Sequence, residues 1–429
     1  MLSTYRQALR LPGAVAFSSA GFFARLPIAI IGLGIVLMVS LTTGSYAFAG
    51  ILSASFALTA AAGAIITSRW TDRVGQSRTL PLLATAQAVA LVLLVSSVMS
   101  EQARALQVLA ALVAGFLQPA CGSFVRARWV HIAPTTPVLR TAFAWESVLD
   151  ELIFTFGPLI ASVLAFSVGL AAPLVVAAVL VATGGWALAL QKRTEPPVIV
   201  PSKNTSAVKE KSAILQTGMP ALVVASIGAG ALFGAFDVAV VAFTAQRGHP
   251  GMAGVVLALW ATGSLIGGLF FGSRQWPYSL PNLLVFVAAA QVVVVFPAWL
   301  LPNTPALIVS SMIAGLAVAP TLISLFSIAE RLVPPRQLTE GLTWANSALA
   351  LGFALGTSVG GILIDARGTS WAFLLAWAGT ILTFVVAVVA RKLFLRGISG
   401  RSAPDPVAIP LEEPIPGATS TGFIDPTAP

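Results

Sequence analysis

Long apolar runs dominate this sequence and restrict the environment in which it can fold. About twenty consecutive apolar residues in a helix cross the ~30 Å hydrocarbon core of a bilayer. Of the 429 residues, 57% are hydrophobic and only 9% are charged, which is not the balance of a soluble domain. The sequence therefore predicts an all-α polytopic membrane protein with twelve transmembrane helices, near residues 13–40, 44–68, 79–100, 104–131, 139–166, 169–190, 219–245, 251–273, 281–301, 305–330, 338–364 and 370–390.

A polar stretch between the sixth and seventh runs divides the chain. Residues 191–218 are basic and contain proline, which is typical of a flexible loop. The last residues are proline-rich, with DPVAIPLEEPIPG and DPTAP, and predict disorder. We expect an N-terminal six-helix bundle (1–190), a cytoplasmic central loop (191–218), a C-terminal six-helix bundle (219–391) and a disordered cytoplasmic tail (392–429).

The distribution of basic residues predicts the orientation in the membrane. The net charge is +9. With the N-terminus in the cytoplasm, the outer loops contain only Arg104, Arg247 and Arg367. Apart from Arg25, which lies within the first run, the other basic residues lie in or beside inner loops and termini. The positive charge is thus a topology signal and does not indicate a nucleic-acid partner. The first run is too long for a signal-peptide core and is read as an uncleaved span. We expect a multi-pass protein of the cell (inner) membrane with both termini cytoplasmic.

The two halves repeat. Residues 139–162 align with 338–361 at an offset of 199, which matches Trp145 with Trp344 and Gly157 with Gly356. The second and eighth runs align at an offset of 204, with Ala49-Gly50 and Gly63 against Ala253-Gly254 and Gly267. A six-helix unit repeated in the same orientation predicts two pseudo-symmetric six-helix bundles, the plan of secondary transporters with a substrate site between the bundles.

Three acids in the fifth run have no acidic counterpart in the second half. Glu146, Asp150 and Glu151 align with Ala345, Leu349 and Ala350. The fold therefore does not need acids at these positions. Each carboxylate at membrane depth costs roughly 2.5–3.5 kcal/mol, so such groups usually face a partner or a wet cavity. We infer that these acids have a chemical role in the function of the protein.

Depth along the helices suggests which charges pair. Counted from the inner end of each run, Arg25 lies ~18 Å deep, Asp150 and Glu151 ~15–16 Å and Glu146 ~9 Å. We expect Arg25 to meet Asp150 or Glu151, and Glu146 to meet Arg126. A carboxylate released from its arginine would then carry a proton. The alternative is a permanent salt bridge that fixes helix packing.

Other polar residues are weaker candidates. Asp237, the only charge in the seventh run, is a second proton or cation site, an outer-gate contact or a capped helix residue. Gln118 and Asn346 line a cavity or bond neighbouring helices. Trp145 and Trp344 stack on a substrate or serve as interfacial packing residues. His131 is read as an interfacial residue. Cys121, His131 and His249 do not have the spacing of a zinc site, and no nucleotide-binding loop is present, so no metal or cofactor is expected.

The loop after the second run, SRWTDRVGQSRTL, resembles the signature loop of the major facilitator superfamily. Asp72, Arg73 and Gly75 match the pattern and Arg78 supplies a nearby basic residue, whereas Ser68 and Gln76 depart from it. Gly157-Pro158 resembles the helix-bend motif of the proton-coupled exporters in that superfamily. The resemblance covers about residues 10–392. It implies an inner gate formed by Asp72, Arg73 and Arg78; the alternative is a basic loop that only sets topology.

Together these features predict a proton-coupled secondary transporter that works by alternating access and exports a small organic compound. Its partners would be the lipid bilayer, protons and the substrate, and the protein would act as a monomer. An uptake symporter of the same fold is the first alternative. The second is a non-transporting receptor or lipid-handling protein on the same scaffold. An enzyme is not expected, because no Ser-His, di-aspartate or metal constellation is present.

Overall fold

The computed structural model describes residues 2–133, 136–198, 212–274, 276–301, 303–334 and 337–399. Within these ranges the chain is helical, and twelve helices are long and apolar enough to cross a membrane. They run close to the predicted spans: the first is Ala14–Thr43 and the last is Thr369–Val389. The predicted fold class is confirmed.

The first half of the chain forms one bundle. Its helices are α1 (Leu2–Leu9), α2 (Ala14–Arg25), α3 (Pro27–Thr43), α4 (Tyr46–Val74), α5 (Gln76–Met99), α6 (Arg104–Phe116), α7 (Cys121–Ile132), α8 (Thr136–Ser167) and α9 (Ala172–Ala189). The first span combines α2 with α3, and the fourth combines α6 with α7. Pro27 has no backbone N–H and begins α3, so the first span is broken directly after Arg25.

The second half forms the other bundle. Its helices are α10 (Met219–Gln246), α11 (Met252–Gly272), α12 (Leu280–Val295), α13 (Thr304–Gly315), α14 (Val318–Leu332), α15 (Leu338–Arg367), α16 (Thr369–Val389) and α17 (Arg391–Ser399). Short 3-10 helices lie at Lys192–Thr194 (η1), Ala213–Leu215 (η2) and Phe296–Leu300 (η3).

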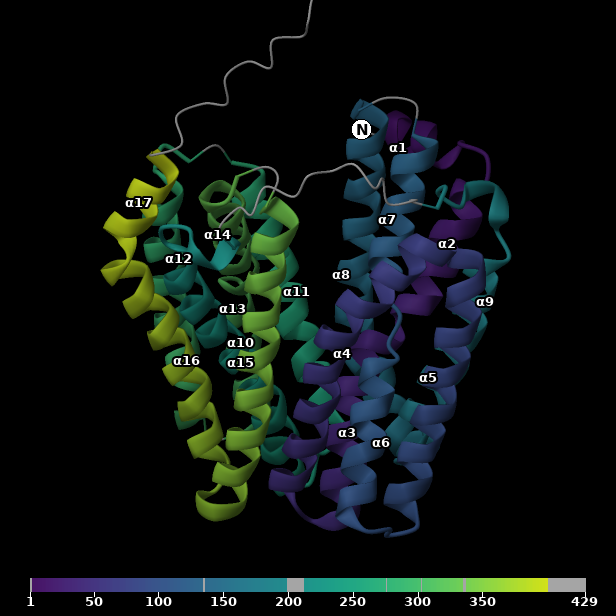
Figure 1. The fold of residues 1–429 in the computed structure, drawn as a ribbon. Coiled ribbons are helices and arrows are strands. Elements are labelled where there is room, and N and C mark those ends of the chain that lie inside the picture. Colours follow the sequence, from purple (N-terminus) through teal and green to yellow (C-terminus); the bar gives the residue numbers. More distant parts are fainter. Residues whose placement is uncertain are drawn as a thin grey trace, which may run out of the picture.

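The two bundles lie close together at one end and apart at the other (Figure 1). The chain starts at the spread end, which we call the terminal end, and the opposite end is the far end. The bundles meet through α4 with α15 and through α8 with α11. The contacting residues belong to the parts of these helices that border the far-end turns, so the far end is the closed one.

Small residues allow this close approach. A Cβ atom added to Gly50 would lie 2.2 Å from the carbonyl oxygen of Thr357, and one added to Gly254 would lie 2.4 Å from that of Pro158. Gly50 corresponds to Gly254, and Pro158 to Thr357, under the two repeat offsets. The repeat seen in the sequence therefore produces two equivalent close contacts between the bundles, because only glycine leaves room for a neighbouring backbone.

The predicted tail begins too early. Residues 391–399 form α17, and Phe394 is buried in a cluster with Leu332 and Met219. An apolar side chain that packs in this way keeps the first turns after the last span helical. The rest of the predicted tail (400–429) and the middle of the predicted central loop (199–211) lie outside the described residues. The other domain boundaries stay predictions.

Candidate functional site

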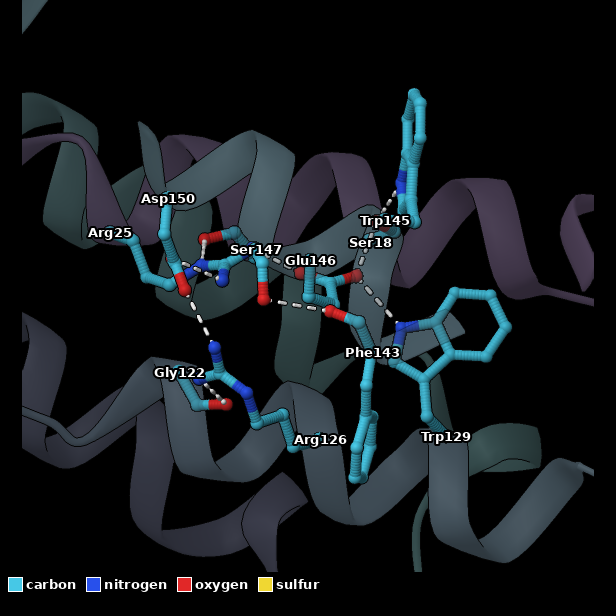
Figure 2. Close-up of polar contacts among 11 residues, drawn as sticks. Ser18, Arg25, Gly122, Arg126, Trp129, Phe143, Trp145, Glu146, Ser147 and Asp150 are labelled. Carbon is cyan, nitrogen blue, oxygen red and sulfur yellow. Dashed lines mark hydrogen bonds and ion pairs between the residues drawn. The ribbon is translucent and has the colours of Figure 1, made fainter. Parts of the chain in front are cut away.

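A network of charged side chains lies inside the first bundle (Figure 2). Arg25 forms ion pairs with Glu146 and with Asp150, whose Oδ1 lies 2.7 Å from Nη1. The other oxygen of Asp150 lies 2.6 Å from Nη2 of Arg126. Glu146 and Asp150 are four residues apart on α8 and share one helix face, so a single guanidinium reaches both. The network thus joins α2, α7 and α8.

One side of the network is sealed. Arg25 is 2% exposed and Glu146 is completely buried. Besides Arg25, Glu146 accepts hydrogen bonds of 2.7 Å from Ser18 Oγ and from Trp129 Nε1. Trp145 Nε1 donates to Ser18 Oγ at 3.1 Å. Buried charges are tolerated only when they are paired and their remaining positions are hydrogen-bonded, and Glu146 meets both conditions.

The other side of the network is partly exposed. The Asp150 side chain is 28% exposed and that of Arg126 is 38% exposed. The two arginines and two carboxylates sum to zero charge when all are ionised. The network therefore contains a sealed ion pair, Arg25 with Glu146, and an accessible one, Arg126 with Asp150. The guanidinium of Arg25 links them, because it also pairs with Asp150.

Arg25 meets Asp150 as expected, but the partner of Glu146 differs from the expectation. Glu146 meets Arg25 and not Arg126, which meets Asp150. Depth counted along separate helices ignores the direction in which side chains point, and the shared face of Glu146 and Asp150 decides the pairing. Glu151 points about 100° away from Asp150. It is half-buried, and in the described part of the chain it forms no ion pair or hydrogen bond.

Asp237 lies apart from this network. It is half-buried in α10, between the buried residues Phe236 and Val238, and within the described ranges it has no ion pair or hydrogen bond. The core cluster that contains its two neighbours also includes Ile31 of the first bundle. Helix α10 also contacts α3 and α4 of the first bundle, so Asp237 is a carboxylate without a described partner in a helix at the junction of the two bundles.

The remaining predicted residues have varied surroundings. The Gln118 amide oxygen lies at the break between α6 and α7, is buried, and has no partner among the described residues. Asn346 is exposed and donates to the Leu342 carbonyl at 3.1 Å. Trp344 is exposed, whereas its repeat partner Trp145 joins the charge network. The matched tryptophans thus do not have matched contacts.

The predicted helix-bend pair lies within an unbroken helix. Helix α8 continues through Gly157 and Pro158. A Cβ atom on Gly157 would lie 2.4 Å from Cβ of Ala29, so the glycine permits α8 to approach α3. A bend at this pair stays a prediction.

The predicted gate loop lies at the terminal end. Gly75 ends α4 with a φ of 98°, a conformation that other residues rarely adopt. Asp72, Arg73 and Arg78 are exposed, and across the described ranges none of them forms an ion pair or hydrogen bond. These three gate residues therefore have no bond to another described residue at the end where the bundles are apart.

Sequence reasoning missed a second polar network beside this loop. Arg128 is completely buried and donates to Gln76 Oε1 at 2.7 Å, to the Gln191 carbonyl at 2.7 Å and to Thr194 Oγ1 at 2.8 Å. These bonds tie α7 to the start of α5 and to the chain after α9. Gln76, which departs from the family pattern, is the hydrogen-bond acceptor at its centre.

A small apolar pocket lies against the charge network. It has a volume of about 310 Å³ and lies between the α1–α2 segment and α8. Its polar lining includes Ser18 and Trp145, which connect it to Glu146. No group of three or more potential metal-binding side chains occurs in the described part of the chain.

Comparisons with known proteins agree with this architecture. The family model described as Major Facilitator Superfamily matches residues 17–274 and 274–417. A solved mutant of the nucleoside transporter NupG has a TM-score of 0.70 and 16% identity, and the match covers 89% of this chain and 99% of that one. A bacterial homologue of the human lysosomal transporter Spinster, in an inward-facing and occupied conformation, has a TM-score of 0.62 and 16% identity over 94% of this chain and 99% of that one. No curated relative matches in sequence.

Because the two ion pairs differ in burial, we expect mutations in them to lower the stability of the fold by different amounts. Glu146→Gln leaves the sealed Arg25 short of one negative charge and should lower stability by about 3–5 kcal/mol, the cost of breaking a buried pair. Asp150→Asn should cost less, because Asp150 and Arg126 are both partly exposed. Thermal unfolding of the purified variants in detergent measures the order. An equal loss, or a larger loss for Asp150→Asn, would contradict the assignment of sealed and accessible sides.

Proposed function

Because the chain belongs to the major facilitator superfamily and has the fold of its transporters, we propose that it is a proton-coupled secondary transporter exporting a small organic compound by alternating access. The observation that carries the proposal is the charge network of Arg25, Glu146, Asp150 and Arg126. An intramembrane charge cluster with one accessible side is a candidate proton site. The second half of the chain has alanine and leucine at the positions of these acids, so packing alone does not require them.

In this proposal Asp150 is the carboxylate that takes up and releases the proton, with Glu151 beside it as the other candidate. Protonation of Asp150 would weaken its pairs with both arginines and leave the sealed pair of Arg25 with Glu146 in place. The network would then have a net charge of +1, which is unfavourable in hydrocarbon unless Arg126 reaches water or Glu151 is ionised nearby. Protonation would therefore favour a different arrangement of α7 and α8.

Movement of α8 connects this site to the rest of the molecule. The far-end part of α8 packs against α11 of the other bundle, where Gly254 N–H donates to Ser162 Oγ at 2.8 Å. When the far end opens, α8 and α11 must separate. A change in the bonds of Asp150 on the same helix can thus bias the equilibrium between the two arrangements of the bundles.

The terminal end is proposed to face the cytoplasm, in the cell membrane, on the basis of the Lys and Arg distribution. The structure then corresponds to a state that is open to the inside and closed to the outside. Export, as opposed to uptake, rests on the resemblance of Gly157-Pro158 to the exporter motif. A C-terminal reporter fusion found outside the cell would contradict the orientation.

Asp237 is proposed as a second proton or cation site. It is the only charged residue in α10, and the chain supplies no partner for it among the described residues. An unpaired carboxylate at this depth requires a proton or a cation from solution.

Coupling predicts that Asp150→Asn or Glu151→Gln abolishes transport driven by a pH gradient, because an amide cannot exchange the proton. The test is proteoliposomes with an imposed pH gradient and an internal pH dye, supplied with a neutral probe (uridine) and a cationic probe (ethidium). Wild-type protein should show probe-dependent proton movement. Arg367→Ala, which removes an exposed charge away from the network, is the matched control. Coupled flux that survives in both carboxamide variants would transfer the proton role to Asp237 or Glu146.

The gate role predicts a separate defect for Asp72→Asn. We propose that Asp72, Arg73 and Arg78 hold the bundles together when the terminal end closes, which is consistent with their lack of partners in the present state. The variant should insert and fold normally but cycle several-fold more slowly, and an uncoupled exchange assay at equal pH measures this rate. A normal exchange rate in well-expressed Asp72→Asn protein would exclude the gate role.

A further inference from the structure

At the far end, a carboxylate of one bundle caps a helix of the other. Asp365, in the last turn of α15, accepts hydrogen bonds from the backbone N–H of Tyr46 at 3.0 Å and of Ala47 at 2.9 Å. It also accepts one from Ser45 Oγ at 2.9 Å. These donors form the N-terminus of α4, for which Ser45 is the N-cap residue. The ion pairs of Arg25 and Arg126 lie within the first bundle, whereas Asp365 is a charged side chain that bonds from one bundle to the other.

The N-terminus of a helix favours such an anion. Its first N–H groups have no partner within the helix, and the helix dipole places positive charge there. Ser45 Oγ satisfies Phe48 N–H, as an N-cap side chain usually does. The first two N–H groups of the helix, of Tyr46 and Ala47, are satisfied by Asp365. Completion of the α4 cap therefore depends on a residue from the opposite bundle.

The repeat shows that docking of the bundles does not itself require this acid. At the equivalent contact between α8 and α11, the offset of 199 places Phe166 at the position of Asp365. Phe166 lies against Gly251, next to the start of α11. The two close glycine contacts, Gly50 with Thr357 and Gly254 with Pro158, are formed on both sides. The contact between α8 and α11 therefore has an aromatic ring at the position where the contact between α4 and α15 has a carboxylate.

We propose that Asp365 is the releasable latch of the far end, a positioning residue that stabilises the closed far end and must leave the α4 N-terminus when that end opens. This role deepens the proposed function, because it rests on alternating access. It does not depend on the ion or the substrate. A charge-assisted contact that water reaches can separate without leaving a buried charge unpaired, whereas a buried ion pair cannot.

The test measures opening of the far end without substrate and without a pH gradient, so failure of proton coupling would not affect it. Spin labels at the exposed residues Gln102 and His249, in a Cys121→Ser background, report the distance between the bundles by pulsed electron resonance. Asp365→Ala should raise the ratio of separated to closed far ends about tenfold, the effect of losing a charged helix cap. Asp365→Asn should have a smaller effect, because the amide oxygen still accepts hydrogen bonds.

Arg367→Ala is the matched control, since Arg367 lies two residues away over the Trp371 ring, 4.7 Å from its centroid. It should leave the distance distribution unchanged. Ser45→Ala removes one donor of the same contact and should act in the same direction as Asp365→Asn, which provides a second variant if Asp365→Ala does not fold. An unchanged distribution in the folded Asp365 and Ser45 variants, or an equal shift in Arg367→Ala, would overturn the latch.

Discussion

The structure of the first bundle depends on the neutralisation of Arg25 inside the membrane. A buried guanidinium always remains charged, and hydrocarbon offers it no water, so the chain must supply anions within reach. Glu146 and Asp150 do so from one face of α8. Their positions in turn determine the contacts of Ser18, Trp129 and Arg126. The packing of α2, α7 and α8 around one another follows from this requirement.

The two halves share a framework and differ where charges occur. The glycines that bring α4 to α15 and α8 to α11 lie at equivalent positions, so the framework follows the repeat. Glu146 corresponds to the buried Ala345, and Asp365 corresponds to Phe166. A buried alanine at the position of Glu146 shows that this site packs without charge. The acids at these positions are therefore the best guide to functions that the repeat alone does not explain.

The sequence was sufficient to predict the twelve spans, the two bundles and the family, because hydropathy and the repeat are properties of the chain itself. It also singled out Arg25, Glu146, Asp150 and Arg126. Arg25 meets Asp150 as expected, whereas the expected pair of Glu146 with Arg126 was wrong, since depth along a helix does not state which face meets a neighbour.

Other contacts between distant segments could not be predicted. Ser18 and Trp129 meet Glu146 from helices far away in the sequence. Arg128 was read only as a topological charge, although it is buried against Gln76. Asp365 lies at the end of a span, where an acid is ordinary, and only the position of α4 gives it a partner. Such roles depend on tertiary packing, which a single sequence does not encode in any local pattern.

The central claim is that Asp150 changes its protonation while Glu146 remains ionised within the sealed side. Infrared difference spectroscopy of the reconstituted protein, with isotopically labelled aspartate to separate Asp from Glu bands, measures this directly after a pH step. The account predicts a protonated-carboxyl band with the aspartate isotope shift that is absent in Asp150→Asn and retained in Asp365→Asn. A band that persists unchanged in Asp150→Asn, or that carries the glutamate frequency and disappears in Glu146→Gln, would contradict it.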